Sequence, residues 1–292
     1  MSISTAAIII RYAQAEANSL VIAAARMIIS TLPLIPMVLF RHTGELKRLS
    51  KRSVILSLLS GIFLAVHFAT WITSLEYTTI ASSVVLVCTT PIWVTLFGVV
   101  VYHEKVSRAV IVGIGLALIG GIFVALNESC SLSFISFDCD FTSAAVSGRI
   151  IIGNILAFVG ALMAAGYLLI GRVVRKNVSL VPYAFIVYGT SAILLSGWIL
   201  LSQTPVGVYS PMTYFFFALL AVFPQLVGHS SLNWALKYLS TTYVAIAQMG
   251  EPVGSTLLAI IIFKEIPSPL KIIGALFIMA GIFAVSRKAL TT

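Results

Sequence analysis

The sequence AQMGEPVG, residues 247–254, lies midway along an apolar segment that covers residues 241–263. A charged side chain at the centre of a membrane-spanning helix costs about 2.5–3.5 kcal/mol, so Glu251 is an expensive residue at this position. Pro252 follows it, and proline removes a backbone donor and kinks a helix. Glycines flank the pair on both sides. Together these residues predict a membrane helix that is broken around a polar feature near the bilayer midplane.

The composition of the chain is that of an integral membrane protein. Of the 292 residues, 60% are hydrophobic and 9% are charged, and the mean hydropathy is +1.08. Soluble domains are about 45–50% apolar and about 25% charged. The net charge of +9 does not indicate nucleic-acid binding, because the cations gather in short segments between apolar stretches. That distribution is typical of a protein that crosses a membrane several times.

The apolar stretches predict ten transmembrane helices, since a spanning helix needs about 20 apolar residues. The predicted spans are 2–16, 19–40, 53–75, 79–101, 107–126, 149–170, 179–201, 211–233, 241–263 and 269–287. The first is short, which indicates a truncated start or a tilted or partial helix. A cleaved signal peptide is the competing interpretation. No basic residue precedes the apolar stretch and Arg11 lies just before the supposed cleavage site, and both features argue against cleavage.

The basic residues set the orientation. Most of the 18 Lys and Arg fall on one side of the predicted membrane, which predicts that both termini are cytoplasmic. We expect a plasma membrane, most simply a bacterial inner membrane, and a monomer or homodimer. Residues 127–148 then form the longest extracytoplasmic loop. Cys130 and Cys139 lie in this loop, and the sequence leaves open whether they form a disulfide or remain free thiols.

The chain contains an internal repeat. A shift of 161 residues, the sequence distance from Pro91 to Pro252, also places Gly113 on Gly274 without a gap. The same shift places Glu104 on Glu265, Gly120 on Gly281 and Tyr77 on Tyr238. Each half therefore has five spans, and an odd number inverts the second half relative to the membrane. The predicted fold class is an all-α integral membrane protein of ten helices, arranged as two inverted five-helix repeats.

Polar residues within the spans are the candidates for a site. His67 and Trp71 are four residues apart and share a helix face, as do Gln225, His229 and Asn233 in the equivalent span of the other repeat. The candidate binding or coupling residues are Arg26, His67, Trp71, Trp93, Gln225, His229, Asn233, Gln248 and Glu251, and the predicted helix breaks are at Pro91 and Pro252. No metal-ligand spacing occurs, and no cofactor is expected.

Each candidate has a structural alternative. The histidine stripes are equally suited to hydrogen bonds between helices. Glu251 is suited to a buried pair with a histidine or arginine, and Trp93 to a lipid-facing position. Arg26 either binds a carboxylate, pairs with an acid or extends its head to the interface. Under the repeat shift, Thr90 is the neutral counterpart of Glu251, which predicts a site with one charged wall and one neutral wall.

These residues resemble the ten-helix, EamA-type family of the drug/metabolite transporter superfamily. The likeness rests on Ala25-Arg26, on Leu75-Glu76-Tyr77-Thr78 leading to Pro91, on the stretch GHSSLNWA at 228–235, and on Glu251-Pro252. It covers nearly the whole chain, with residues 1–126 as the first EamA-type repeat and 149–292 as the second. The resemblance implies a central cavity that opens alternately inward and outward, and export more often than import.

The sequence therefore predicts a secondary transporter of small metabolites, amino-acid-like or drug-like, that works by alternating access. Burial favours the neutral forms of a carboxyl and an imidazole, so Glu251 and His229 suit either proton exchange or binding of a substrate ammonium. Proton coupling and facilitated diffusion both remain open. A lipid flippase is the alternative function, because it uses the same repeats. A membrane-embedded enzyme is a weak third hypothesis, since the histidines lie on separate segments.

Overall fold

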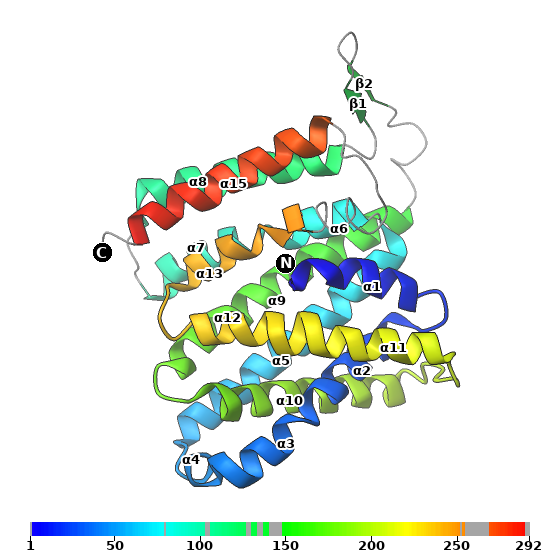
Figure 1. The fold of residues 1–292 in the computed structure, drawn as a ribbon, viewed down its shortest axis with the longest axis vertical. Helices are drawn as coiled ribbons and strands as arrows, with labels where there is room; N and C mark the ends of the chain where they lie inside the picture. Colours follow the sequence, from blue (N-terminus) through cyan, green and yellow to red (C-terminus); the bar gives the residue numbers. More distant parts are fainter. Residues whose placement is uncertain are drawn as a thin grey trace.

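The structure is a computed structural model, and it describes residues 2–78, 80–102, 106–126, 130–132, 137–139, 148–251, 253–254 and 269–289. The described chain is almost entirely helical, with one short hairpin (Figure 1). The helices correspond in order to the predicted spans, which confirms the fold class. The predicted ninth span is described only as far as residue 254, and Pro252 lies outside the described residues.

The first repeat begins with a short helix and contains one interrupted span. Its elements are η1 (Ile3–Thr5), α1 (Ala6–Ala13), α2 (Ser19–Thr31), α3 (Leu34–Met37), η2 (Val38–His42), α4 (Thr43–Lys47), α5 (Lys51–Tyr77), α6 (Ile80–Val87), α7 (Thr90–Tyr102) and α8 (Arg108–Leu126). The predicted span 19–40 continues through a π-helical segment to Lys47.

The second repeat follows the hairpin formed by β1 (Cys130–Leu132) and β2 (Phe137–Cys139). Its elements are α9 (Gly148–Arg175), α10 (Leu180–Leu201), α11 (Pro211–Leu220), η3 (Ala221–His229), α12 (Ser230–Ala235), α13 (Thr241–Gln248) and α15 (Pro269–Ala289). The α9 helix extends beyond the predicted end at residue 170. Its last residue, Arg175, is buried and donates from Nε to the carbonyl of Asn233 at 2.9 Å, so this arginine belongs to the packed helix and not to a loop.

Helix length separates two groups of spans. Within the described residues, five helices are long and apolar enough to cross a membrane: Ser19–Lys47, Lys51–Tyr77, Gly148–Arg175, Leu180–Leu201 and Pro211–Ala235. Shorter apolar helices cover Ile3–Ala13, Thr90–Val100, Arg108–Phe123 and Ile272–Ala284. The protein is therefore a multi-pass membrane protein whose shorter helices belong to the first, fourth, fifth and tenth predicted spans.

The close packing of α8 and α15 displays the inverted relation between the repeats. A Cβ added to Gly120 would lie 2.5 Å from the carbonyl oxygen of Gly274, and one added to Gly281 would lie 2.5 Å from that of Gly113. The 161-residue shift exchanges these two contacts. These contacts run in opposite directions along the two helices, so the equivalent helices are antiparallel and the repeats are inverted relative to each other. Figure 1 shows α8 and α15 side by side.

The two helix breaks also coincide under the repeat shift. The α6 helix ends at Val87 and α7 begins at Thr90, while α13 ends at Gln248 and is followed by a turn at residues 249–250. The residue pairs 87 and 248, and 89 and 250, are each 161 apart. Both repeats therefore interrupt a helix at the same internal position, just before the proline at 91 and the proline at 252.

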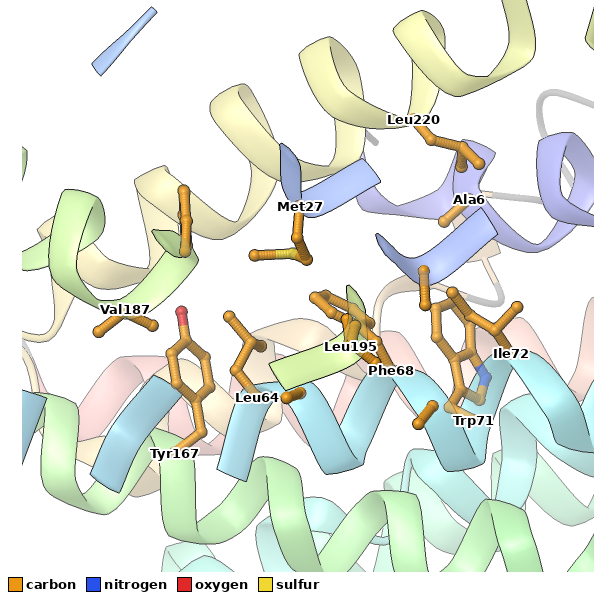
Figure 2. Close-up of a cluster of buried hydrophobic side chains, with 14 of the residues drawn as sticks. Ala6, Met27, Leu64, Phe68, Trp71, Ile72, Tyr167, Val187, Leu195 and Leu220 are labelled. Carbon is orange, nitrogen blue, oxygen red and sulfur yellow. The ribbon is translucent and has the colours of Figure 1, made fainter. Parts of the chain in front are cut away.

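The core lies where α2, α5, α9 and α10 pack together. A β-carbon on Gly61 would collide with Thr190, and one on Gly166 with Phe63, so small residues allow these helices to approach closely. Figure 2 shows the cluster that results, with Ala6, Met27, Leu64, Phe68, Trp71, Ile72, Tyr167, Val187, Leu195 and Leu220 pointing toward one another.

Three glutamates bind the N-terminal ends of helices that begin elsewhere in the chain. A carboxylate is favoured there because the first backbone N–H groups of a helix lack intrahelical acceptors. Glu16 accepts from the backbone N–H of Ser210 at 2.9 Å, Glu45 from that of Ser179 at 2.7 Å, and Glu76 from that of Ser19 at 3.1 Å. The N–H of Ser210, followed by the hydroxyl of Thr213, lowers the pKa of the exposed Glu16 carboxyl. These acids therefore connect helix ends.

The glycine contacts predict at which positions an added methyl group lowers the stability of the protein. We expect Gly120→Ala and Gly281→Ala to destabilise the protein by about 1–3 kcal/mol each, because the added carbon would meet backbone atoms that must shift. The measurement is the temperature at which half of the detergent-solubilised protein is lost from the monodisperse peak in size-exclusion chromatography.

Gly115→Ala is the matched control on the same α8 helix, since a Cβ at Gly115 meets nothing within 4 Å among the described residues. Alanine is the better helix former, so this variant should be as stable as the wild type or more stable. Equal losses at residues 115 and 120 would contradict the packing argument.

The hairpin register generates a second prediction. Cys130 and Cys139 are directly opposed across β1 and β2. Opposed residues in antiparallel strands have Cα atoms about 4.5 or 5.5 Å apart, within the range of about 4.4–6.8 Å that disulfides bridge. We expect the two thiols to form a disulfide if the loop faces an oxidising compartment. Mass spectrometry after alkylation of the denatured, unreduced protein should find only Cys88 modified. Alkylation of all three cysteines would contradict this prediction.

Candidate functional site

A cavity lies between the two helix breaks, near the centre of the bundle. Its walls come from η1, α5, α6, α7, α9, η3 and α13, with residues Ile3, His67, Trp71, Val87, Cys88, Thr90, Pro91, Ala164, Tyr167, Leu168, His229, Ala245, Gln248, Met249 and Glu251. The space open to the centres of water molecules is about 30 Å³. That is room for roughly two waters, so the cavity is small in this conformation.

The repeat symmetry runs through the cavity. Its lining contains four pairs of residues that are 161 positions apart: Ile3 with Ala164, Val87 with Gln248, Cys88 with Met249, and Thr90 with Glu251. The cavity therefore lies on the axis that relates the two repeats. In two of the pairs the first repeat supplies a smaller or less polar side chain and the second supplies an amide or a carboxylate. Glu251 and its neutral counterpart Thr90, the pair from which the sequence predicted a charged and a neutral wall, both line the cavity.

The α13 wall presents hydrogen-bond acceptors that have no protein donor. Gln248 and Glu251 are three residues apart and lie on one side of the broken helix. The Oε1 atoms of both side chains are buried and lack a partner among the described residues. Unpaired buried polar atoms are costly and call for an explanation such as a ligand or water. This wall is suited to a group with several N–H donors.

Other lining residues supply ring N–H groups and aromatic faces. The Nε1 of Trp71 and the Nδ1 of His229 are buried and without a partner in the described part of the chain. His67 stacks on Trp71 with ring centroids 5.9 Å apart and an interplanar angle of 9°. Its Nδ1 lies 2.8 Å from the carbonyl oxygen of Gly160 and donates to it, which fixes the orientation of the ring.

A buried polar network lies behind the cavity wall. The hydroxyl of Tyr167 donates to Asn233 Oδ1 at 2.7 Å, and Asn233 Nδ2 donates to the hydroxyl of Tyr188 at 3.4 Å. Nε of Arg26 donates to Gln225 Oε1 at 3.0 Å. Gln225 and Asn233 are fully buried, and these bonds join α2, α9, α10, η3 and α12. The network holds Tyr167 in place as part of the cavity wall.

The structure divides the candidate residues into two sets. His67, Trp71, His229, Gln248 and Glu251 line the cavity, as does Pro91 at the first break. The others lie elsewhere: Arg26, Gln225 and Asn233 belong to the network behind the wall, and Trp93 donates to Thr89 Oγ1 at 3.2 Å and packs edge-on against Phe158. Trp93 is thus not among the lining residues, and Pro252 lies outside the described residues.

Several lining residues were not among the sequence candidates. Thr90, Cys88, Val87 and Ile3 line the cavity, and so does Tyr167 on α9. The repeat shift had already identified Thr90 as the counterpart of Glu251, and it could have identified Cys88 and Val87 in the same way, because it places them on Met249 and Gln248.

The described residues contain no group of three His, Cys, Asp or Glu placed to hold a metal ion. The cavity within this part of the chain offers one carboxylate, two imidazoles, an indole, an amide and hydroxyl groups. Such a set binds a small polar or amphipathic molecule through hydrogen bonds, charge and aromatic contact.

Comparison with known proteins places the chain in a family. The model of the EamA-like transporter family matches residues 1–126 and again residues 151–287. A solved crystal structure of another protein superposes with a TM-score of 0.76 at 17% sequence identity, over 99% of this chain and 94% of that one. No significant match was found among curated protein sequences. The two family matches cover most of the chain and coincide with the two repeats, so this multi-pass membrane protein belongs to the EamA-like transporter family, a family of transporters and not of enzymes.

Proposed function

We propose that the protein is a secondary transporter that exports small metabolites bearing an amino group, by alternating access to the central cavity. The proposal places it in a plasma membrane, most simply a bacterial inner membrane, with both termini in the cytoplasm. The family supports transport of a small molecule. The substrate class, the direction and the coupling are the parts that we propose.

The observation that carries the proposal is the pairing of the two helix breaks across a cavity on the repeat axis. Carriers built from inverted repeats bind their substrates near the midplane, where discontinuous helices release backbone groups and polar side chains. Here Val87, Cys88 and Thr90 face the cavity at one break, and Gln248, Met249 and Glu251 face it at the other. Rocking of one repeat against the other would open this shared cavity to each side in turn.

The small volume of the cavity supports a mechanism in which the helices around it move. Space for roughly two waters is too small for a metabolite, so a substrate requires a rearrangement. The π-helical segment η3 is a suitable place for it, because it contains Pro224 and contributes His229 to the wall. π-helical turns and prolines are where helices bend and where their hydrogen-bond pattern changes.

The carboxyl group of Glu251 is suited both to binding a substrate ammonium group and to exchanging a proton. Its Oε1 has no donor within the described residues, and Gln248 Oε1 beside it adds a second acceptor. A substrate ammonium would satisfy both oxygens, while Trp71 and Tyr167 offer aromatic faces to a cation. When the substrate leaves, a proton on the carboxyl would remove the buried charge. Substrate and proton would thus compete for Glu251, which couples their movements in opposite directions.

This coupling predicts the behaviour of Glu251→Gln in proteoliposomes. Glutamine keeps the size and one acceptor but carries neither the charge nor the exchangeable proton. In wild-type vesicles, a pH gradient should drive substrate accumulation above the level without a gradient. We expect the variant to lose gradient-driven accumulation entirely and to lower substrate exchange at equal pH at least tenfold. Uptake of a panel of radiolabelled amines and amino acids measures both quantities.

Glu16→Gln is the matched control, because Glu16 is an exposed carboxylate outside the cavity that binds Ser210 and Thr213. It should retain gradient-driven transport. Unchanged gradient-driven flux in Glu251→Gln at every pH tested would refute proton exchange at this residue. If Glu251→Gln loses gradient-driven transport but keeps substrate exchange at equal pH, proton coupling at Glu251 is supported. Binding of the substrate ammonium by Glu251 is then contradicted.

A further inference from the structure

Arg26 is a buried cation that its surroundings leave partly unsatisfied. Its side chain on α2 has no exposed surface. Nε donates to Gln225 Oε1, whereas Nη1 and Nη2 have no hydrogen-bond partner among the described residues. The guanidinium carbon lies 4.1 Å from the centroid of the Phe68 ring, which covers one face of the group. The outer edge of the guanidinium, which carries both Nη atoms, is thus the part that remains unpaired.

An uncompensated charge of this kind is expensive inside a membrane protein, and it is retained where it has a function. No described acid forms an ion pair with Arg26. Glu16, Glu45 and Glu76 are occupied at helix ends. Glu251 interacts with Arg26 electrostatically, but its Oε1 also remains without a partner in the described residues. Within the described residues, the bundle therefore contains a buried cation without an ion-pair partner and a buried carboxyl group with an unpaired oxygen.

Glu251 and Arg26 differ in their position relative to the cavity. Glu251 lines the cavity directly. Arg26 lies behind Phe68, and the Phe68 ring meets the imidazole of His229, itself a lining residue, edge-on at a centroid distance of 5.3 Å. His229 and Gln225 both belong to the π-helical segment η3. A shift of η3 that enlarges the cavity would move His229 and Gln225 relative to Arg26 and Phe68, which belong to α2 and α5.

We propose that Arg26 is a carboxylate subsite of the carrier, and that the substrates are zwitterions whose ammonium binds Glu251 while their carboxylate binds the Nη1 and Nη2 atoms of Arg26. This inference rests on the proposed transport function and narrows its substrate class. The planar guanidinium edge matches the two oxygens of a carboxylate. A molecule with both charges would satisfy both unpaired groups, whereas a simple amine would leave Arg26 uncompensated.

The experiment compares matched compounds that differ in one group. Proteoliposomes are loaded with an equimolar mixture of the twenty proteinogenic amino acids, or with the amines that their decarboxylation yields, or with the acids that lack the amino group. Efflux of each compound is quantified by mass spectrometry. For the wild type we expect one or more amino acids to leave at least tenfold faster than the corresponding amine and the corresponding acid.

Arg26→Gln tests the subsite itself. It should remove the preference for amino acids over their amines, a loss of about tenfold or more, while the efflux of the amines is retained. Arg26→Lys keeps the charge but cannot donate two parallel hydrogen bonds to a carboxylate. This variant should therefore retain part of the preference for amino acids over amines that Arg26→Gln loses. Glu251→Gln should lower the efflux of amino acids and amines alike.

Other outcomes would contradict the proposal that Arg26 is a carboxylate subsite. If Arg26→Gln lowers amine and amino-acid efflux by the same factor, Arg26 has only a structural role. If the wild type transports amines but no amino acid, the inference that the substrates are zwitterions is wrong, while the proposed transport of amino compounds stands. If the wild type transports none of the three sets, the proposed function fails together with the inference. The melting temperature of each purified variant shows whether it is folded.

Discussion

Two polar helix breaks in an apolar bundle are the constraint on which the rest of the structure depends. In lipid, a backbone group without a hydrogen bond or a charge without a partner costs several kcal/mol, so a broken helix must turn its break toward protein or water. At the turns at residues 88–89 and 249–250 the backbone N–H groups bond carbonyls three or four residues earlier, and Cys88 and Met249 both line the cavity. Both interrupted helices therefore meet at one protein-enclosed space.

The repeat symmetry explains how one cavity acquires two different walls. Duplication places equivalent residues on opposite sides of the axis, as the paired contacts of Gly120 with Gly274 and of Gly281 with Gly113 show. Divergence after duplication then concentrates polarity in the second repeat: Thr90 corresponds to Glu251 and Val87 to Gln248, and all four line the cavity. An acceptor-rich wall opposite an aromatic wall orients an asymmetric ligand, which a strictly symmetric cavity would not do.

The polar residues fall into two groups. Some are hydrogen-bonded in the buried network or at helix ends, and others have atoms that remain unpaired and could bind a ligand. Asn233 and Gln225 are engaged with Tyr167 and Arg26, and Glu45 and Glu76 bind helix ends. Most of the atoms left without partners within the described residues belong to Glu251, Gln248, His229, Trp71 and Arg26; the others are on Gln14, Thr95 and Gln225, whose Nε2 is unpaired although its Oε1 binds Arg26. Because buried polar groups are normally paired, this concentration favours a ligand at the cavity over a purely structural role for these side chains.

The sequence by itself determined the ten spans, the inverted repeat and the position of both breaks, because hydropathy, span number and the coincidence of prolines and glycines under one shift are local or periodic signals. It also selected Glu251, His67 and His229. The tertiary structure alone decided which polar residues reach the cavity. Gln225, His229 and Asn233 are four residues apart, yet only His229 lines it, and Trp93 packs against Phe158. Burial of Arg26 was likewise undetermined, since an arginine near a helix end can extend to the interface or fold inward, and only the packing of α2 against α5 and η3 excludes the first.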